Sequence, residues 1–358
     1  MTRNKINTTQ FVCIMTLFIM GTSIVTEYNR DSKHDTWLAM LLAAVVFVPV
    51  MLMYARISTL HPDKNLFEII FFQFGKIGGY IFAVVLTLYF FLLGVIITRT
   101  FTEFVHVSAL QKTPEILMAL PLCLLCSILA AKGVQVIGRV GFVLFVLSVI
   151  IMLATVLLSI VNVDFINILP VFDVSVSKMA GSTLFFLSYP FAECIALLCL
   201  SGSIKDGQSK YKAYILGLIL GAVFLLSNSL RTILVLGQSA YISSHFPSYI
   251  ALGTIQISSF IQRIESLFSG LFLMCVFVKL AVCVYCISLG LNSMVKIKRK
   301  NMAAIGTTIV MALIAVAAFK NVIELSNFCT RVQMWLALPV QVLVPMSVWI
   351  KSEMRRRR

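Results

Sequence analysis

Ten apolar stretches separated by short polar segments dominate the hydropathy pattern of this chain. Each is close to the ~20 residues that an α-helix needs to cross about 30 Å of hydrocarbon. Strands of a membrane barrel would be about half as long and would alternate in polarity, and these stretches do neither. The pattern therefore predicts an all-α, polytopic membrane protein with one domain over residues 1–358. Its transmembrane helices are expected at about 10–27, 37–55, 80–99, 115–131, 140–161, 180–201, 213–237, 266–290, 302–319 and 330–350.

The longest connection, roughly 56–79, contains an amphipathic segment at residues 65–74. We expect this segment to form a short helix that lies flat on the inner membrane surface. The glycines in Lys76–Gly79 are expected to end it before the third span begins.

The composition excludes the two or three soluble domains that 358 residues would otherwise allow, because 60% of the residues are hydrophobic and only 12% are charged. A mean hydropathy of +0.99 supports the same conclusion. No Gly-rich phosphate loop, GxSxG elbow or HExxH helix appears, so we do not expect an enzyme. Cys123 and Cys126, and likewise Cys283 and Cys286, lie inside apolar helices without acidic or histidine neighbours at ligand spacing. We interpret them as core cysteines and expect no metal or other cofactor.

Topology accounts for the formal charge of +15. With the N-terminus inside, nineteen of the 29 basic residues fall in inner segments and nine in outer loops. Cytoplasmic loops carry the excess of Lys and Arg, so both termini are predicted to be cytoplasmic. The basic runs Lys296–Lys300 and Arg355–Arg358 flank spans, and such runs usually anchor topology and attract membrane lipid rather than nucleic acid.

Two spans are predicted to be broken near mid-depth. Span one contains Gly21, Thr22 and Ser23, and span six contains Ser188-Tyr-Pro190-Phe-Ala-Glu193. Pro190 has no amide to donate, so carbonyls of the preceding turn need other partners. Interrupted helices at corresponding positions of two five-helix halves indicate a midplane binding site, as in LeuT-type inverted repeats. The alternative is an ordinary proline kink together with a glycine packing contact.

Two charges of opposite sign lie close to the bilayer centre. Glu193 is 15 positions after Lys178, and Lys279 is 14 positions after Glu265. Intramembrane charges are costly, so they usually face a cavity and pair with each other. We hypothesise that Lys279 supplies a tethered cation where sodium-coupled relatives bind an ion, and that Glu193 lines the ligand cavity. A purely structural ion pair is the alternative.

A second polar group is expected at the outer mouth, where it would form a gate or an entry path. Solvated helix ends are the simpler explanation. The residues are Arg99 and Glu103 at the end of span three, Arg231 beside Asn228 in span seven, and Arg263 and Glu265 before span eight.

In several local patterns, taken in order, the chain resembles the permease-like B subunits of endospore germinant receptors, the GerAB type, within the amino acid/polyamine/organocation transporter superfamily. The patterns are Asp35-Thr-Trp37, Asn65-Leu-Phe-Glu68, Phe74-Gly-Lys76, Thr98-Arg99 with Glu103, Thr113-Pro114, Lys132-Gly133, Gly138-Arg139, Leu169-Pro-Val171, Phe191-Ala-Glu193, Leu236-Gly237 and Arg263-Ile-Glu-Ser266.

This resemblance implies a LeuT-like five-plus-five inverted repeat of ten helices in the spore inner membrane. It also implies assembly with a larger A subunit and a lipoprotein C subunit, and recognition of a small nutrient such as an amino acid, sugar or nucleoside. The implied ligand-binding residues are Gly21, Thr22, Ser23, Tyr89, Ser188, Tyr189, Pro190, Phe191 and Glu193, with Glu103 on the outer path.

The chain departs from the family pattern in span one. Family members usually carry a Gly-rich, Pro-containing stretch there, whereas Met20–Tyr28 has one glycine and no proline, with Glu27 near its outer end. Ligand chemistry is therefore expected to differ from that of amino-acid sensors with the fuller motif.

Three functions use the same pocket. The first is a sensor whose ligand-driven movement passes to partner subunits. The second is a secondary active amino-acid transporter coupled to protons through Glu193 or Glu265. A water or ion passage that opens during germination is the third.

Overall fold

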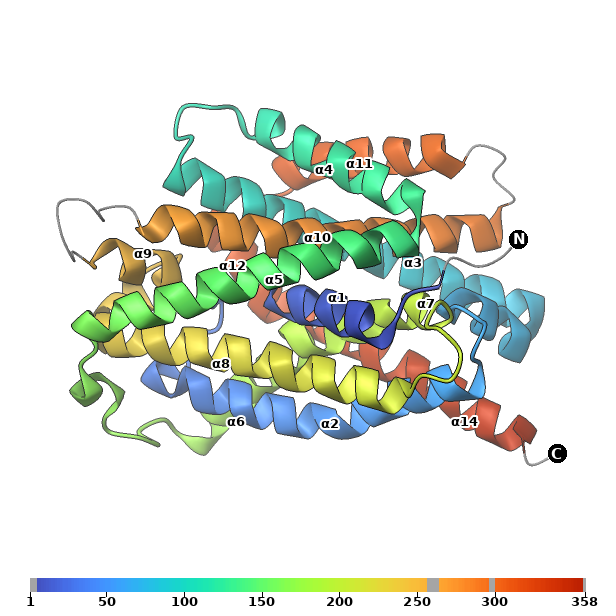
Figure 1. Ribbon diagram of the computed structural model, residues 1–358, viewed down its shortest axis with the longest axis horizontal. Helices are drawn as coiled ribbons and strands as arrows, with labels where there is room; N and C mark the ends of the chain where they lie inside the picture. The colour runs from blue at the N-terminus through green and yellow to red at the C-terminus, as the bar shows by residue number, and fades with distance from the viewer. Residues whose placement is uncertain (1–4, 256–263, 296–299, 357–358) are drawn as a thin grey trace.

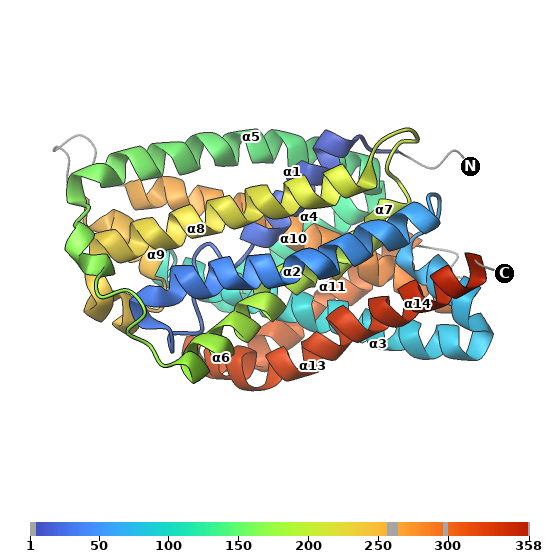
Figure 2. The same ribbon diagram turned by 90° about the horizontal axis from the view of Figure 1, so that it is seen from below.

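The computed structural model describes residues 5–255, 264–295 and 300–356, and these ranges consist mainly of helices. Figures 1 and 2 show an elongated bundle in which the long helices run roughly along one axis. The helices are α1 Thr8–Met20, α2 Thr36–Leu60, α3 Leu66–Ser108, α4 Glu115–Lys132, α5 Val134–Ser159, α6 Val176–Phe186, α7 Leu198–Ser201, α8 Lys210–Ser243, α9 Pro247–Gly253, α10 Ile264–Met294, α11 Lys300–Ala317, α12 Val322–Phe328, α13 Met334–Leu338 and α14 Val344–Arg356. Shorter 3-10 or π segments are η1 Lys33–Asp35, η2 Ile160–Asn162, η3 Phe165–Ile168, η4 Leu187–Phe191, η5 Ala192–Leu197, η6 Cys329–Gln333 and η7 Pro339–Leu343.

The predicted all-α, polytopic architecture is confirmed. Within the described residues, eight helical segments are long and apolar enough to cross a membrane. Two shorter apolar helices, Thr8–Met20 and Ala304–Ala317, correspond to the first and ninth predicted spans. One face of α5 exposes Val143, Ile150 and Leu157 by 56%, 59% and 64%. An exposed apolar stripe of this kind is expected on a helix that faces lipid.

The start of α1 and the end of α14 lie at the same end of the bundle, which we call the termini end (Figures 1 and 2). Lys5 forms ion pairs there with Asp63 and Asp206, and Arg56 pairs with Glu353 at 2.6 Å. Residues from five segments thus meet at one end, as the alternating order of the predicted spans requires.

The expected break between the helix at 65–74 and span three is present, but it falls at Gly75 and not within Lys76–Gly79. Asn65 and Glu68 form a capping box that starts the helix at Leu66, and α3 then runs to Ser108 with a kink at Gly75. Gly75 has φ +70°, a left-handed conformation that glycine adopts without steric cost. The helix also continues past the predicted end at residue 99, because Arg99 is buried and paired instead of solvated.

Close contact between α1 and α8 depends on two glycines one turn apart on α8. A Cβ at Gly217 would overlap the Met15 side chain, and one at Gly221 would lie 2.7 Å from Ile19. Small residues of this kind let two helix backbones approach closely in a membrane. Helix α1 also contacts α5 and α10, so it occupies the interior of the bundle.

Candidate functional site

Span one is broken at Gly21. A capping box of Asn7 and Gln10 starts α1, and the helix ends at Met20. Gly21 has φ +28°, which lies in the region that favours glycine. Residues 21–30 contain no helix, so the second half of the predicted span is irregular backbone, although Thr22 and Glu27 are buried.

Irregular backbone at membrane depth is tolerated only where protein groups satisfy its polar atoms. The Ile24 carbonyl accepts a hydrogen bond of 2.9 Å from the Asn228 amide on α8. The Thr22 carbonyl accepts one of 2.8 Å from the Thr26 hydroxyl. The break is therefore supported by specific side chains within the bundle.

Span six is also broken, as predicted. Helix α6 ends at Phe186 and gives way to the π segment η4 and then the 3-10 segment η5. Tyr189, immediately before Pro190, has φ −131° and ψ 109°, which are extended values. Ser188, Tyr189, Pro190, Phe191 and Glu193 are all buried, so this second break also lies inside the protein.

Lys279 on α10 and Glu193 on η5 form an ion pair between the two breaks. Lys279 Nζ lies 2.5 Å from Glu193 Oε2, and both side chains are 0% exposed. The other carboxylate oxygen, Oε1, has no hydrogen-bond partner among the described residues. Removing one member of a buried pair leaves an uncompensated charge, so each residue constrains the other.

The Lys279 side chain passes directly over Gly21. A Cβ built on Gly21 would overlap Cδ of Lys279 and would lie 3.0 Å from Nζ. The ammonium group is also 5.3 Å from the Phe18 ring centroid and 5.2 Å from that of Tyr189, within the range of cation–π attraction. Lys279 therefore contacts both broken segments.

Tyr189 joins the two breaks directly. Its hydroxyl donates a hydrogen bond of 2.6 Å to Thr22 Oγ1 and lies 3.0 Å from Thr26 Oγ1. Ser23 is buried in the same irregular segment. Phe191 instead stacks on Phe47 of α2, with ring centroids 6.3 Å apart. The structure thus brings Gly21, Thr22, Tyr189, Glu193 and Lys279 together and directs Phe191 elsewhere.

Sequence reasoning missed Gln341, which lies in the π segment η7 and is 0% exposed. Its Nε2 donates to Tyr89 Oη at 2.8 Å and to the Ser188 carbonyl at 3.0 Å, and its Oε1 accepts from Ser188 Oγ at 3.1 Å. Its backbone carbonyl accepts from the Tyr54 hydroxyl. An amide flanked by Val340 and Val342 in an apolar span was the signal available, because intramembrane polar groups usually face the bundle interior.

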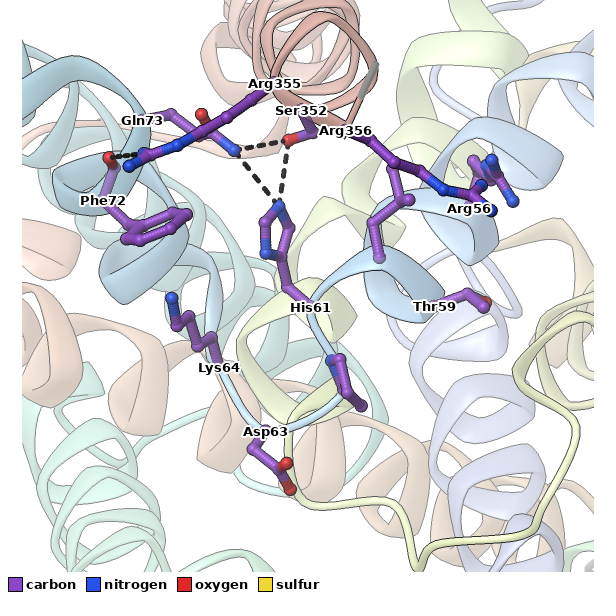
Figure 3. Close-up of a pocket in the computed structure, with 12 residues that line it drawn as sticks. Arg56, Thr59, His61, Asp63, Lys64, Phe72, Gln73, Ser352, Arg355 and Arg356 are labelled. Atoms are coloured by element: carbon purple, nitrogen blue, oxygen red, sulfur yellow. Dashed lines mark hydrogen bonds between the residues drawn. The ribbon is translucent and has the colours of Figure 1, made fainter. Parts of the chain in front are cut away.

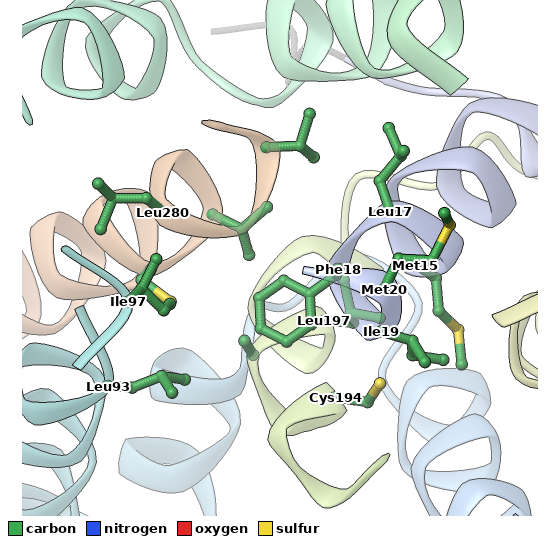
Figure 4. Packing of buried hydrophobic residues seen from close by; sticks show 14 of the residues in the cluster. Met15, Leu17, Phe18, Ile19, Met20, Leu93, Ile97, Cys194, Leu197 and Leu280 are labelled. Carbon is green, nitrogen blue, oxygen red and sulfur yellow. The ribbon is translucent and has the colours of Figure 1, made fainter. Parts of the chain in front are cut away.

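The space around the two breaks is closed. Figure 4 shows Phe18 directed from α1 towards Leu93 and Ile97 of α3, with Leu280 of α10 close by. Tyr28 donates to or accepts from Thr100 across 2.8 Å, and its ring lies 5.9 Å from that of Tyr189. Aromatic and apolar side chains therefore pack closely around the two breaks.

Of the polar residues predicted at the outer mouth, Arg99 and Arg231 lie within helices and not at helix ends. Arg99 forms ion pairs with Glu103 and with Glu115, the first residue of α4, and is 2% exposed. The interpretation as a solvated helix end is therefore wrong for Arg99. The cluster ties α3 to α4.

Arg231 likewise lies inside α8, which continues to Ser243 through a kink at Gly237. Its Nη2 donates to Asn228 Oδ1 at 2.8 Å, and its guanidinium lies 5.2 Å from the Phe268 ring centroid. Glu265 is half-buried in the first turn of α10, and Arg263 lies outside the described residues.

Spans one and six are both broken, and the two breaks face each other inside the helical bundle. Helical arrangements of this kind occur in transporters with the LeuT fold, an inverted repeat of two five-helix halves. MhsT in complex with L-phenylalanine matches with a TM-score of 0.72 at 11% identity, covering 96% of this chain and 91% of MhsT. Mhp1, a nucleobase-cation-symport-1 family transporter in a closed conformation with bromovinylhydantoin bound, matches with a TM-score of 0.65 at 12% identity, covering 91% and 75%. The predicted LeuT-like fold is confirmed, and the chain has the architecture of a membrane permease.

The chain belongs to the Spore_permease family of spore germination proteins, whose family pattern matches residues 5–323. It is 22% identical to spore germination protein KB of Bacillus subtilis (strain 168), covering 100% of this chain and 97% of that protein. It is 23% identical to spore germination protein YndE of the same organism, covering 97% and 98%. The predicted family resemblance is confirmed, and its relatives are permeases and germination proteins rather than enzymes.

Proposed function

We propose that this protein is the nutrient-sensing membrane subunit of a spore germinant receptor. A small germinant such as an amino acid, sugar or nucleoside would bind at mid-depth between the break of α1 and segments η4 and η5. The Lys279–Glu193 ion pair at Gly21 carries this proposal, because it places two charges of opposite sign where both broken spans meet.

In this account Lys279 acts as a tethered cation that holds the two breaks together without a bound metal ion. Its ammonium contacts the α1 break at Gly21 and the η5 carboxylate at once. A ligand that competes for Glu193, or that separates the Tyr189 hydroxyl from Thr22, changes the relative stability of the closed and open arrangements. In this proposal, the change in the populations of the closed and open arrangements is what the receptor transmits.

We further propose that both termini are cytoplasmic, that the membrane is the spore inner membrane, and that an A subunit and a lipoprotein C subunit receive the movement. The charge distribution supports this orientation, because the excess of basic residues falls in segments at the termini end. Membership of the germination family supports the location and the partners.

A nutrient panel on spores that carry only this receptor tests the proposal, repeated with Glu193→Gln. We expect the wild-type spores to respond to a restricted set of nutrients and the variant to change sensitivity to them. An unchanged profile and sensitivity in the variant would contradict a role for Glu193 in ligand recognition.

Proton-coupled amino-acid transport is the second candidate, favoured by the unpartnered Oε1 of the fully buried Glu193. A carboxylate that is not fully hydrogen-bonded at mid-depth can accept a proton during a transport cycle. Accumulation of a labelled amino acid by the purified protein in liposomes under a pH gradient distinguishes transport from sensing. Copurification with the A subunit and no accumulation would favour the sensor.

A further inference from the structure

A cavity of about 700 Å³ opens at the termini end, away from the midplane site. Figure 3 shows it between the α2–α3 connection and the end of α14. The residues that matter for its chemistry are Arg56, His61, Lys64, Gln73, Arg355 and Arg356. Two segments that are far apart in sequence, residues 56–73 and 352–356, therefore build one pocket.

The pocket is strongly basic. Among its lining residues, Asp63 is the acid, and its side chain is 66% exposed and 3.9 Å from Lys5. Arg56 is paired with Glu353. Lys64, Arg355 and Arg356 thus contribute positive charge that the remaining lining residues do not neutralise.

Two of these cations share a single aromatic ring. Lys64 Nζ lies 3.3 Å from the centroid of Phe72, and the Arg355 guanidinium carbon lies 4.1 Å from it. Arg355 also donates a hydrogen bond of 3.0 Å to the Phe72 carbonyl, which holds it in place. Figure 3 shows the Phe72 ring between Lys64 and the Arg355 side chain. Like charges this close repel each other, and a nearby anion would relieve the repulsion.

The floor of the pocket is an ordered polar group. His61 Nε2 lies 3.0 Å from Ser352 Oγ, and Gln73 Nε2 donates to the same oxygen at 3.0 Å. Gln73 and Ser352 are buried, and Figure 3 shows the imidazole directed towards both of them. A group with several acceptor oxygens fits such a mixture of cations and neutral polar side chains.

An apolar groove adjoins the basic pocket and shares Arg56 with it. Trp349, Ile350 and Met354 of α14 line this groove, whose volume is about 520 Å³. Ile350 and Met354 are 47% and 58% exposed, on a face that is expected to meet lipid. A small soluble anion in the basic pocket would leave this apolar groove empty, whereas a lipid would place an acyl chain in it.

We propose that this pocket binds the phosphate of an anionic phospholipid, with Lys64, Arg355 and Arg356 around the headgroup and an acyl chain along Trp349 and Ile350. The bound lipid ties α14 to the connection between α2 and α3, two segments that are separated in the chain by helices α3 to α13. The site is independent of the midplane site and of the proposed sensing role.

The full chain is tested in nanodiscs of phosphatidylcholine alone and of phosphatidylcholine with phosphatidylglycerol. Native mass spectrometry measures how much lipid stays bound to the protein after its release from the nanodisc. Thermal denaturation measures whether that lipid stabilises the protein. We expect wild-type protein to retain phosphatidylglycerol and to melt at a higher temperature when it is present. The double variant Lys64→Gln/Arg355→Gln should lose about thirtyfold in retention, since each of the two basic residues near a membrane surface is worth about 1 kcal/mol.

Lys132→Gln is the matched control, because Lys132 is an exposed cation at the same end and is not among the residues that line the pocket. The charge-conserving Lys64→Arg/Arg355→Lys variant should retain phosphatidylglycerol as wild type does. Its retention shows that a loss in the Gln variant comes from the missing charges and not from misfolding. Equal retention by Lys64→Gln/Arg355→Gln and wild type overturns the proposal. Stabilisation by inorganic phosphate in pure phosphatidylcholine, without any preference for phosphatidylglycerol, also overturns it in favour of a soluble ligand.

Discussion

The Lys279 side chain occupies the volume that a Cβ on Gly21 would need. This relationship couples two features that are far apart in the chain, the end of α1 and the middle of α10. It explains why the break of span one tolerates only a hydrogen at that position, both for backbone conformation and for space.

Gly21→Ala should displace Lys279 and weaken its pairing with Glu193. The φ of +28° and the overlap with Lys279 both oppose a methyl group, so we expect a loss of about 1 to 3 kcal/mol in stability and a strongly reduced germination response. Germination of spores and thermal denaturation of the purified protein measure the two effects.

Gly270→Ala on α10 is the matched control, because a Cβ there meets nothing within 4 Å. It should leave both readouts near wild type, since alanine is favoured over glycine within a helix. Equal behaviour of the two alanine variants would mean that the Gly21 contact has no role.

The losses of stability caused by removing Lys279 and by removing Glu193 should not add up in the double variant. Either Lys279→Met or Glu193→Gln alone breaks the pair, and Lys279→Met leaves Glu193 as a buried charge at a cost of about 3 to 5 kcal/mol. The double variant should recover much of the stability lost by Lys279→Met, yet fail to respond to nutrient. A double-mutant cycle on denaturation temperature measures the coupling. Stable Lys279→Met protein with a normal response would reduce the pair to a dispensable contact.

Gln341→Leu should remove the hydrogen bonds that link η7 to Tyr89 of α3 and to Ser188 of η4. The substitution leaves the Tyr89 hydroxyl without its amide donor and the Ser188 side chain without its acceptor, at about 1 to 3 kcal/mol for the buried groups. Denaturation of purified protein checks this value, with Tyr80→Phe as control, since that hydroxyl lies on the exposed part of α3 and donates to the Met294 carbonyl. A destabilisation no larger than that of the control would contradict the bridging role.

Stability should fall as the pH falls below about 6.5, the ordinary pKa of histidine, with His61 contributing to the slope. Burial lowers the His61 pKa most, and the charges of Lys64, Arg355 and Lys210 lower it further. The unfolded chain therefore takes up a proton at a higher pH than the folded protein does, so acidification favours unfolding. His61→Gln should flatten the dependence of denaturation temperature on pH relative to wild type. An unchanged slope would place the titrating group elsewhere, for example at His245, whose pKa burial also lowers.

Much of the fold was predictable because apolar stretches near ~20 residues and the Gly21 and Pro190 interruptions are local signals. The continuation of α3 past residue 99 was not. Arg99 looks like a helix end until Glu103 and Glu115 are seen to pair with it, and Glu115 belongs to the next helix. Likewise, the contacts of Gln341 with Tyr89 and Ser188 join residues from three spans, and no local pattern contains them.

The central claim is that a nutrient binds where Lys279 and Glu193 meet the two breaks. Saturation binding of the nutrient identified by the spore panel, with purified wild-type protein, Glu193→Gln and the Gly270→Ala control, tests it most directly. We predict that wild type and Gly270→Ala bind with the same affinity and that Glu193→Gln binds at least about tenfold more weakly, as expected when a charge-assisted contact is lost. Equal affinity in all three proteins, with Glu193→Gln correctly folded, would contradict the account.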